Sequence, residues 1–60
     1  MTKLKELREE RFLTQAELAE MIGAAPHSIS RWENGKQKPM FRSIRKLAKA
    51  LKVNPKDIEF

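Results

Sequence analysis

Hydrophobic residues recur at helical spacing in two short runs near the middle of the chain. The repeating apolar positions are Leu18, Ala19 and Ile22 in the first run and Ile29 and Trp32 in the second. Gly23 lies between the runs and can adopt the positive φ that a sharp turn between helices requires. Asn34-Gly35 is a helix stop signal. Residues 14 to 36 are therefore predicted to form two short helices joined by a tight turn.

The segments on either side carry helix signals of their own. Residues 2 to 11 form an amphipathic stretch with Leu4 and Leu7 on the inward face and Thr2 as the expected N-cap. Residues 40 to 51 predict a longer helix with four apolar side chains on one face. These side chains are Ile44, Leu47, Ala48 and Leu51.

The C-terminal residues predict one more short helix. Asn54, Pro55 and Asp57 fit its N-cap, first and third positions, and it is expected to end at Phe60. No segment alternates with a period of two, so no strand is expected. The pattern thus predicts a compact all-α domain of five helices that spans residues 1–60.

The predicted helix starts differ in quality. Thr14 begins a capping box with the glutamate three residues later, whereas Ala25 has no capping side chain to precede Pro26. Met40 also lacks a capping oxygen, and Arg42 opposes the helix dipole in the first turn that follows. A bound phosphate would reverse that cost, so the start of this helix is a candidate anion site.

Composition limits what such a small domain can do. Sixty residues leave no room for a second, catalytic domain, and a chain of this size buries only about 60% of its unfolded surface. The formal net charge of +5 favours polyanionic partners. With no cysteine and one histidine, His27, no disulfide and no metal site built from the usual ligands is expected.

The sequence also carries no sign of catalysis, a cofactor or a membrane. No serine has a base partner placed by the sequence, and there is no glycine-rich phosphate loop, so we expect neither an enzyme nor a cofactor site. No apolar run approaches the ~20 residues of a membrane span. The N-terminus is charged from Lys3 onward, unlike a signal peptide, and a cytoplasmic protein is expected.

Several central residues lie at spacings that are specific in combination. They are Gln15, Ala19, Gly23, Ile29 and the run Glu33-Asn34-Gly35-Lys36. In these positions the chain resembles the phage-repressor family of Cro/C1 (XRE) type, and the resemblance extends from about Leu4 to the C-terminus. It implies a five-helix, lambda-repressor-like fold and a repressor or regulator that binds double-stranded DNA sequence-specifically.

Phe12 departs from the family, which often has glycine or asparagine there. In the left-handed region Phe12 would cost roughly 1–2 kcal/mol, unless the turn differs or burial compensates.

The helix predicted over about residues 26–34 supplies the candidate base readers, since side chains that enter the major groove must come from an exposed face. That face comprises Pro26, His27, Ser30 and Arg31. Arg31 can donate two hydrogen bonds to guanine, and His27 can donate one to guanine N7 or O6. Pro26 offers an apolar edge to a thymine methyl. Family members use the matching positions for base contacts; the alternative is a merely solvated helix face.

Six other residues are candidate contacts to the DNA backbone. They are Gln15, Ser28, Asn34, Lys36, Lys38 and Arg42. Gln15 opens a helix where unpaired N–H groups favour an anion, and the resemblance implies that it braces the backbone and often a base-reading residue. Ser28 and Asn34 are small polar donors, although Asn34 also belongs to the helix stop. For the three cations, a plain role in solubility is the alternative.

The resemblance implies two further features. One is a buried ion pair between Arg8 and Glu33, where the first helix crosses near the end of the third. The other is a homodimer on a two-fold-symmetric DNA site, because one recognition helix reads few bases. The apolar surface available for that dimer is Leu51, Val53, Ile58 and Phe60.

Two other functions stay open. A protein-interaction module, such as an antitoxin-like subunit, predicts a large exposed apolar patch. Met21, Met40, Phe41 and Phe60 could contribute to such a patch. A basic amphipathic peptide that acts on membranes or RNA is a third possibility, and the well-formed turn argues against it. No effector site for a small molecule is evident.

Overall fold

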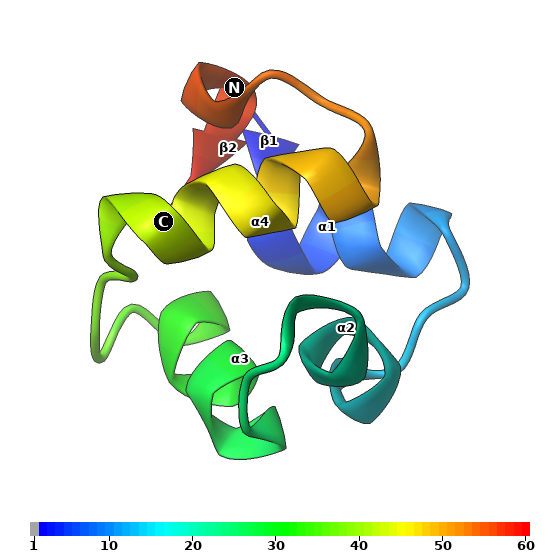
Figure 1. Cartoon of the computed structure of the whole chain (residues 1–60), viewed down its shortest axis with the longest axis vertical. Coiled ribbons are helices and arrows are strands. Elements are labelled where there is room, and N and C mark those ends of the chain that lie inside the picture. Colours follow the sequence, from blue (N-terminus) through cyan, green and yellow to red (C-terminus); the bar gives the residue numbers. More distant parts are fainter. Residues whose placement is uncertain (1) are drawn as a thin grey trace.

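The computed structural model describes residues 2–60 and contains four α-helices in that part of the chain (Figure 1). The helices are α1 (Leu4–Glu10), α2 (Gln15–Ile22), α3 (Pro26–Glu33) and α4 (Phe41–Leu51). A 3-10 turn, η1 (Pro55–Asp57), follows α4. The predicted helix-turn-helix is therefore present, and α3 begins at Pro26 as predicted.

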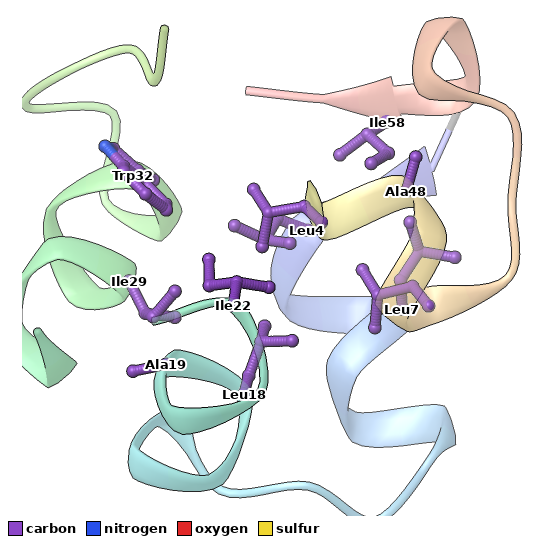
Figure 2. Packing of buried hydrophobic residues seen from close by; sticks show 11 residues of the cluster. Leu4, Leu7, Leu18, Ala19, Ile22, Ile29, Trp32, Ala48 and Ile58 are labelled. Atoms are coloured by element: carbon purple, nitrogen blue, oxygen red, sulfur yellow. The ribbon is translucent and has the colours of Figure 1, made fainter. Parts of the chain in front are cut away.

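The helices enclose one hydrophobic core to which all four contribute (Figure 2). The largest fully buried side chains are Leu4, Leu18, Ile29, Leu47 and Leu51. The inward positions predicted for the two central helices, Leu18, Ala19, Ile22, Ile29 and Trp32, are all buried. Ile44 is an exception on α4, because it is only half-buried.

Two predictions about the chain ends are wrong. Thr2–Lys3 (β1) and Ile58–Glu59 (β2) pair as short parallel strands, with Thr2 opposite Ile58. Strands of two residues are too short to show an alternating pattern. Helix α1 consequently begins at Leu4 behind an uncapped Lys3, so Thr2 is not its N-cap.

The predicted fifth helix is only the 3-10 turn η1, which ends at Asp57 instead of Phe60. Asn54 does act as its N-cap, because its Oδ1 accepts a hydrogen bond from the Lys56 N–H at 3.4 Å. The pairing of β2 with β1 stops the helix, since Ile58 turns into extended backbone and its side chain enters the core. Over residues 2–60, the fold is a four-helix arrangement closed by a pair of short strands.

In the described part of the chain, each of the four helices is followed, one or two residues after its end, by a residue in the left-handed conformation. These residues are Phe12, Gly23, Gly35 and Lys52. After each of them, a backbone N–H bonds a carbonyl five residues earlier, as in a Schellman motif, for example Lys36 to Arg31 at 3.0 Å. Phe12 does adopt the strained conformation, with φ of 56°, and burial does not compensate it because the side chain is 93% exposed.

Candidate nucleic-acid interface

A capping box at its start and a left-handed glycine at its end fix the limits of α2, the first helix of the helix-turn-helix. The Thr14 hydroxyl accepts the Glu17 N–H at 3.0 Å, and the Glu17 carboxylate accepts the Thr14 N–H at 2.8 Å. This is the predicted capping box. Gly23 ends α2 with φ of 71°, and the buried, small Ala19 allows α3 to cross close to α2. The turn therefore fixes how α3 projects from the domain.

Helix α3 has one anchored face and one free face. Ile29 and Trp32 are buried in the core, so the opposite side of the helix points outward. Pro26, His27 and Arg31 lie exposed on that side, as predicted. Ser30 is half-buried, and its hydroxyl accepts a hydrogen bond from the Asn34 side-chain amide at 3.3 Å.

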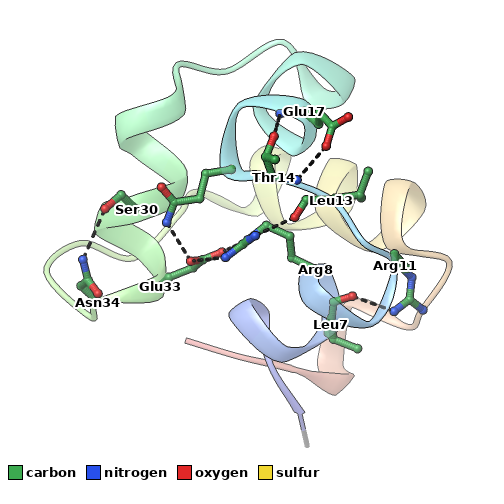
Figure 3. A network of polar contacts seen from close by, with 10 residues as sticks. Leu7, Arg8, Arg11, Leu13, Thr14, Glu17, Ser30, Glu33 and Asn34 are labelled. Carbon is green, nitrogen blue, oxygen red and sulfur yellow. Dashed lines mark hydrogen bonds and ion pairs between the residues drawn. The ribbon is translucent and has the colours of Figure 1, made fainter.

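A polar network ties the C-terminal end of α3 to α1 and α2 (Figure 3). Arg8 donates from Nε to Glu33 Oε2 at 2.6 Å and from Nη2 to Glu33 Oε1 at 3.3 Å. Its third donor, Nη1, bonds the Leu13 carbonyl at 2.6 Å. The hydrogen bond to Glu33 raises the pKa of Arg8 above its ordinary value, so the guanidinium stays charged. The predicted Arg8–Glu33 pair is therefore present, and it is buried on both sides.

Gln15 belongs to this network as well as to the start of α2. Its Nε2 donates to Glu33 Oε1 at 3.0 Å, which holds the half-buried side chain against α3. Glu33 thus accepts hydrogen bonds from two different helices. Among residues 2–60, no buried side-chain nitrogen or oxygen lacks a hydrogen-bond partner. Gln15 is consequently oriented before any ligand arrives.

The remaining candidate backbone contacts follow α3 along the chain. Ser28 is half-buried in the first turn of α3, and Asn34 is exposed at its C-cap. Lys36 and Lys38 are exposed in the connection to α4, and Arg42 is exposed in the first turn of α4. Pro39 is buried in this otherwise polar connection and anchors it to the domain. The polar composition of the segment gives no indication of this burial.

Helix α4 carries a longer row of cations than the single contact predicted from the sequence. Arg42, Arg45, Lys46 and Lys49 line one shallow depression. Their spacing of three, four and seven residues is that of a single helix face, so the signal was present in the sequence. Only Arg42 was predicted as a contact from this row.

The predicted dimer surface is wrong in part. Leu51 and Ile58 belong to the hydrophobic core, with exposures of 0% and 4%. Val53 and Phe60 are partly buried and pack against the same core. The strand pair explains the difference, because it folds the C-terminal residues back onto α1 and α4. Within the described range 2–60, no helix is long and apolar enough to cross a membrane.

Comparison with known proteins agrees with this architecture. The helix-turn-helix family profile matches residues 4–58. The chain is 50% identical over 52 residues to the HTH-type transcriptional repressor RghR of Bacillus subtilis (strain 168), covering 85% of this chain and 38% of that protein. It is 39% identical over 51 residues to the HTH-type transcriptional activator BcrR of Enterococcus faecalis, covering 85% of this chain and 25% of that protein. It is 40% identical over 48 residues to the cryptic phage CTXphi transcriptional repressor RstR of Vibrio cholerae, covering 80% of this chain and 43% of that protein.

A solved structure is similar over nearly the same region. The crystal structure of the P22 c2 repressor protein in complex with synthetic operator 9T superposes with a TM-score of 0.84 and 31% sequence identity. The match covers 87% of this chain and 79% of that one. The curated relatives are longer proteins, and the aligned region spans less than half of each.

Proposed function

This chain belongs to the helix-turn-helix family, and from that premise we propose that it binds double-stranded DNA sequence-specifically as a transcriptional regulator. Repression is the proposed direction, because RghR and RstR are named repressors and the similar solved structure is a repressor bound to an operator. Because DNA is its proposed partner, we propose that the protein acts in the cytoplasm.

The observation that carries the proposal is the two-sided character of α3. Ile29 and Trp32 lock one face into the core, and the exposed face presents Pro26, His27 and Arg31. A helix held in this way can enter the major groove, which is wide enough for an α-helix. Arg31 can donate two hydrogen bonds to a guanine, His27 can donate one, and Pro26 can contact a thymine methyl.

Ser30 has a narrower proposed role at the same face. Its hydroxyl already accepts a hydrogen bond from Asn34, so its own hydrogen is the group available to a base acceptor. Asn34 keeps one amide hydrogen and its carbonyl oxygen for other partners, which suits a phosphate contact through the remaining N–H. The pair therefore links base reading to backbone contact at the end of α3.

The backbone contacts proposed around α3 form two groups. Gln15 and Ser28 offer donors at the first turns of α2 and α3, where the helix dipoles favour a phosphate. Lys36, Lys38 and Arg42 offer exposed positive charge after α3. Such contacts position a protein on the duplex without reading sequence. The excess of positive charge, +5 in all, is consistent with this role.

The test is selection of binding sites from a pool of random duplexes with the purified protein. We expect a defined site to emerge, bound more tightly than scrambled duplex by a factor of at least about 10³. Arg31→Ala should alter the selected sequence at one position of the half-site. A pool that never converges, although it binds at low salt, would contradict sequence-specific recognition.

A further inference from the structure

Helix α4 turns a strongly basic face outward. We define the basic row as Arg42, Arg45, Lys46 and Lys49, which together line one shallow depression. Helix α4 carries no aspartate or glutamate to balance these charges. The ion pairs found between residues 2 and 60 are Arg8–Glu33 and Arg11–Glu10, and neither includes a member of the row.

Without a ligand, the basic row lowers the stability of the folded domain. Like charges three and four residues apart on a helix repel each other. Arg42 also lies in the first turn, against the helix dipole, behind an N-cap that makes no side-chain hydrogen bond. Within residues 2–60, no ion pair or side-chain hydrogen bond offsets these costs, so a ligand that neutralises the row would gain binding free energy.

An apolar groove lies beside the basic row. Phe41, Ile44 and Pro55 supply its apolar lining, and Arg45 and Lys56 are its charged members. Phe41 is 85% exposed although it is a large aromatic residue. Arg45 borders both the groove and the depression of the basic row, so the two features form one continuous surface.

We propose that this surface binds an acidic protein segment that inserts one bulky apolar side chain into the groove. The inserted side chain would cover Phe41 and Ile44, and carboxylates on the same segment would pair with Arg45, Lys46 and Lys49. Apolar burial would supply most of the affinity, because exposed ion pairs contribute little. The charges would set the orientation and the speed of association.

The alternatives fit this surface less well. A second copy of the chain would bring one basic row against another if the contact were two-fold symmetric, and like charges would oppose it. A DNA duplex would neutralise the row, but its phosphates have no partner in the apolar groove. An anionic membrane would attract the cations, but a concave groove suits a single protruding side chain better than a lipid surface.

This inference does not depend on the DNA-binding proposal. Arg42 lies at the end of the row that is also proposed to contact DNA, whereas Arg45, Lys46 and Lys49 lie one to two turns further along α4. None of the residues proposed to bind the acidic segment is among those proposed to contact DNA.

The experiment uses two synthetic, fluorescently labelled peptides that differ at one position. One has a single phenylalanine between flanking glutamates, and the other has alanine in its place. Binding to the whole protein is measured by anisotropy at several salt concentrations, and the site is mapped by amide chemical shifts. The variants are Phe41→Ala and Lys49→Glu, with Lys5→Glu on α1 as the matched charge control. Phe41, Lys49 and Lys5 are all exposed, so these variants should fold.

We expect the phenylalanine peptide to bind at least tenfold more tightly than the alanine peptide, with shifts confined to residues 41–49 and 55–56. Phe41→Ala should abolish this difference. Lys49→Glu should weaken binding about threefold or more at low salt, and Lys5→Glu should have a smaller effect. Equal binding of both peptides, shifts centred on α3, or no saturable binding would overturn the proposal. It would also be overturned if vesicles of phosphatidylglycerol, but neither peptide, bound in a way that requires Phe41.

Discussion

Arg8 Nε lies 2.6 Å from Glu33 Oε2, and this contact joins α1 to the last residue of α3. The two side chains are only 10% and 2% exposed. Glu33 also accepts from Gln15 on α2, so one carboxylate fixes the relative positions of three helices. The network therefore supports the orientation of α3, and with it the proposed base-reading face.

Removing either partner of this pair should destabilise the domain strongly. Arg8→Ala or Glu33→Ala leaves a buried charge without its partner, and the expected loss is about 3–5 kcal/mol. In a domain of this size each kcal/mol corresponds to roughly 4–8 °C in the thermal midpoint. Circular dichroism melts would measure the loss, with Lys5→Ala as the exposed control. A midpoint unchanged within two degrees would contradict the structural role.

Two further variants of the pair separate charge from geometry. Arg8→Lys keeps the positive charge but cannot reproduce three donors in a planar fork, so it should also destabilise. Replacing both residues by apolar side chains should recover much of the loss. Because the raised pKa keeps Arg8 charged well above neutral pH, its part of the stability should not vary between about pH 6 and 9. The contribution would be lost only as pH rises through that raised value.

The strained helix ends should respond to glycine. Phe12→Gly and Lys52→Gly should each stabilise the domain by up to about 1 kcal/mol, because both residues adopt positive φ and are exposed. Gly23→Ala should cost about 1–2 kcal/mol from its φ alone, since an added Cβ would meet no atom within 4 Å. Urea unfolding midpoints would measure all three changes.

Phe12→Ala is the control for that series. Alanine removes the aromatic ring but keeps a Cβ, so the backbone strain stays and no stabilisation is expected. If alanine stabilises the domain as much as glycine does, exposure of the ring, and not the backbone conformation, is the source of the cost.

The core and the turn could be predicted from the sequence because both rest on local signals. Apolar spacing identified Leu18 and Ile29, and Gly23 identified the turn between them. The strand pair could not be predicted, since two-residue strands carry no periodic signal and depend on contacts between opposite chain ends. The same long-range pairing buries Ile58, which the sequence interpretation placed on a dimer surface.

The candidate site likewise has one part that local sequence signals predict and another part that depends on long-range packing. The exposed face of α3 follows from helical geometry once Ile29 and Trp32 are assigned to the core. The hydrogen bond from Gln15 to Glu33 depends on how three helices pack, and spacing along the chain does not determine it. The apolar groove beside α4 likewise depends on how η1 packs beside α4, because Pro55 and Phe41 both line it.

Dimerisation should be weak in solution and evident on DNA. Two of the four apolar residues predicted for the dimer surface are buried in the core, which leaves Val53 and Phe60, both partly buried. Sedimentation should show a monomer for the free protein and two chains on a selected duplex. The selected site should be two-fold symmetric, with half-site centres about 34 Å apart. A site without symmetry that binds one chain would refute this prediction.

Substitutions of base-reading residues and of backbone-contact residues should affect DNA binding in different ways. Arg31→Ala should cost about 1–3 kcal/mol on the preferred duplex and relax the preference at one base pair, because a bidentate contact to guanine is lost. Lys38→Ala and Arg42→Ala should weaken binding to preferred and scrambled duplexes by a similar factor. Each should also reduce the slope of log K against log salt by about one unit.

Titration of both duplexes at several salt concentrations would separate the two classes. Lys5→Ala is the control, because it removes one exposed charge that is not among the candidate DNA contacts. Arg31 contributes a charge as well as hydrogen bonds, so its general effect must be compared with that of Lys38→Ala. The roles would be reversed if Arg31→Ala weakened both duplexes equally while Arg42→Ala alone changed the sequence preference. In that case α4, and not α3, would be the helix that reads the bases.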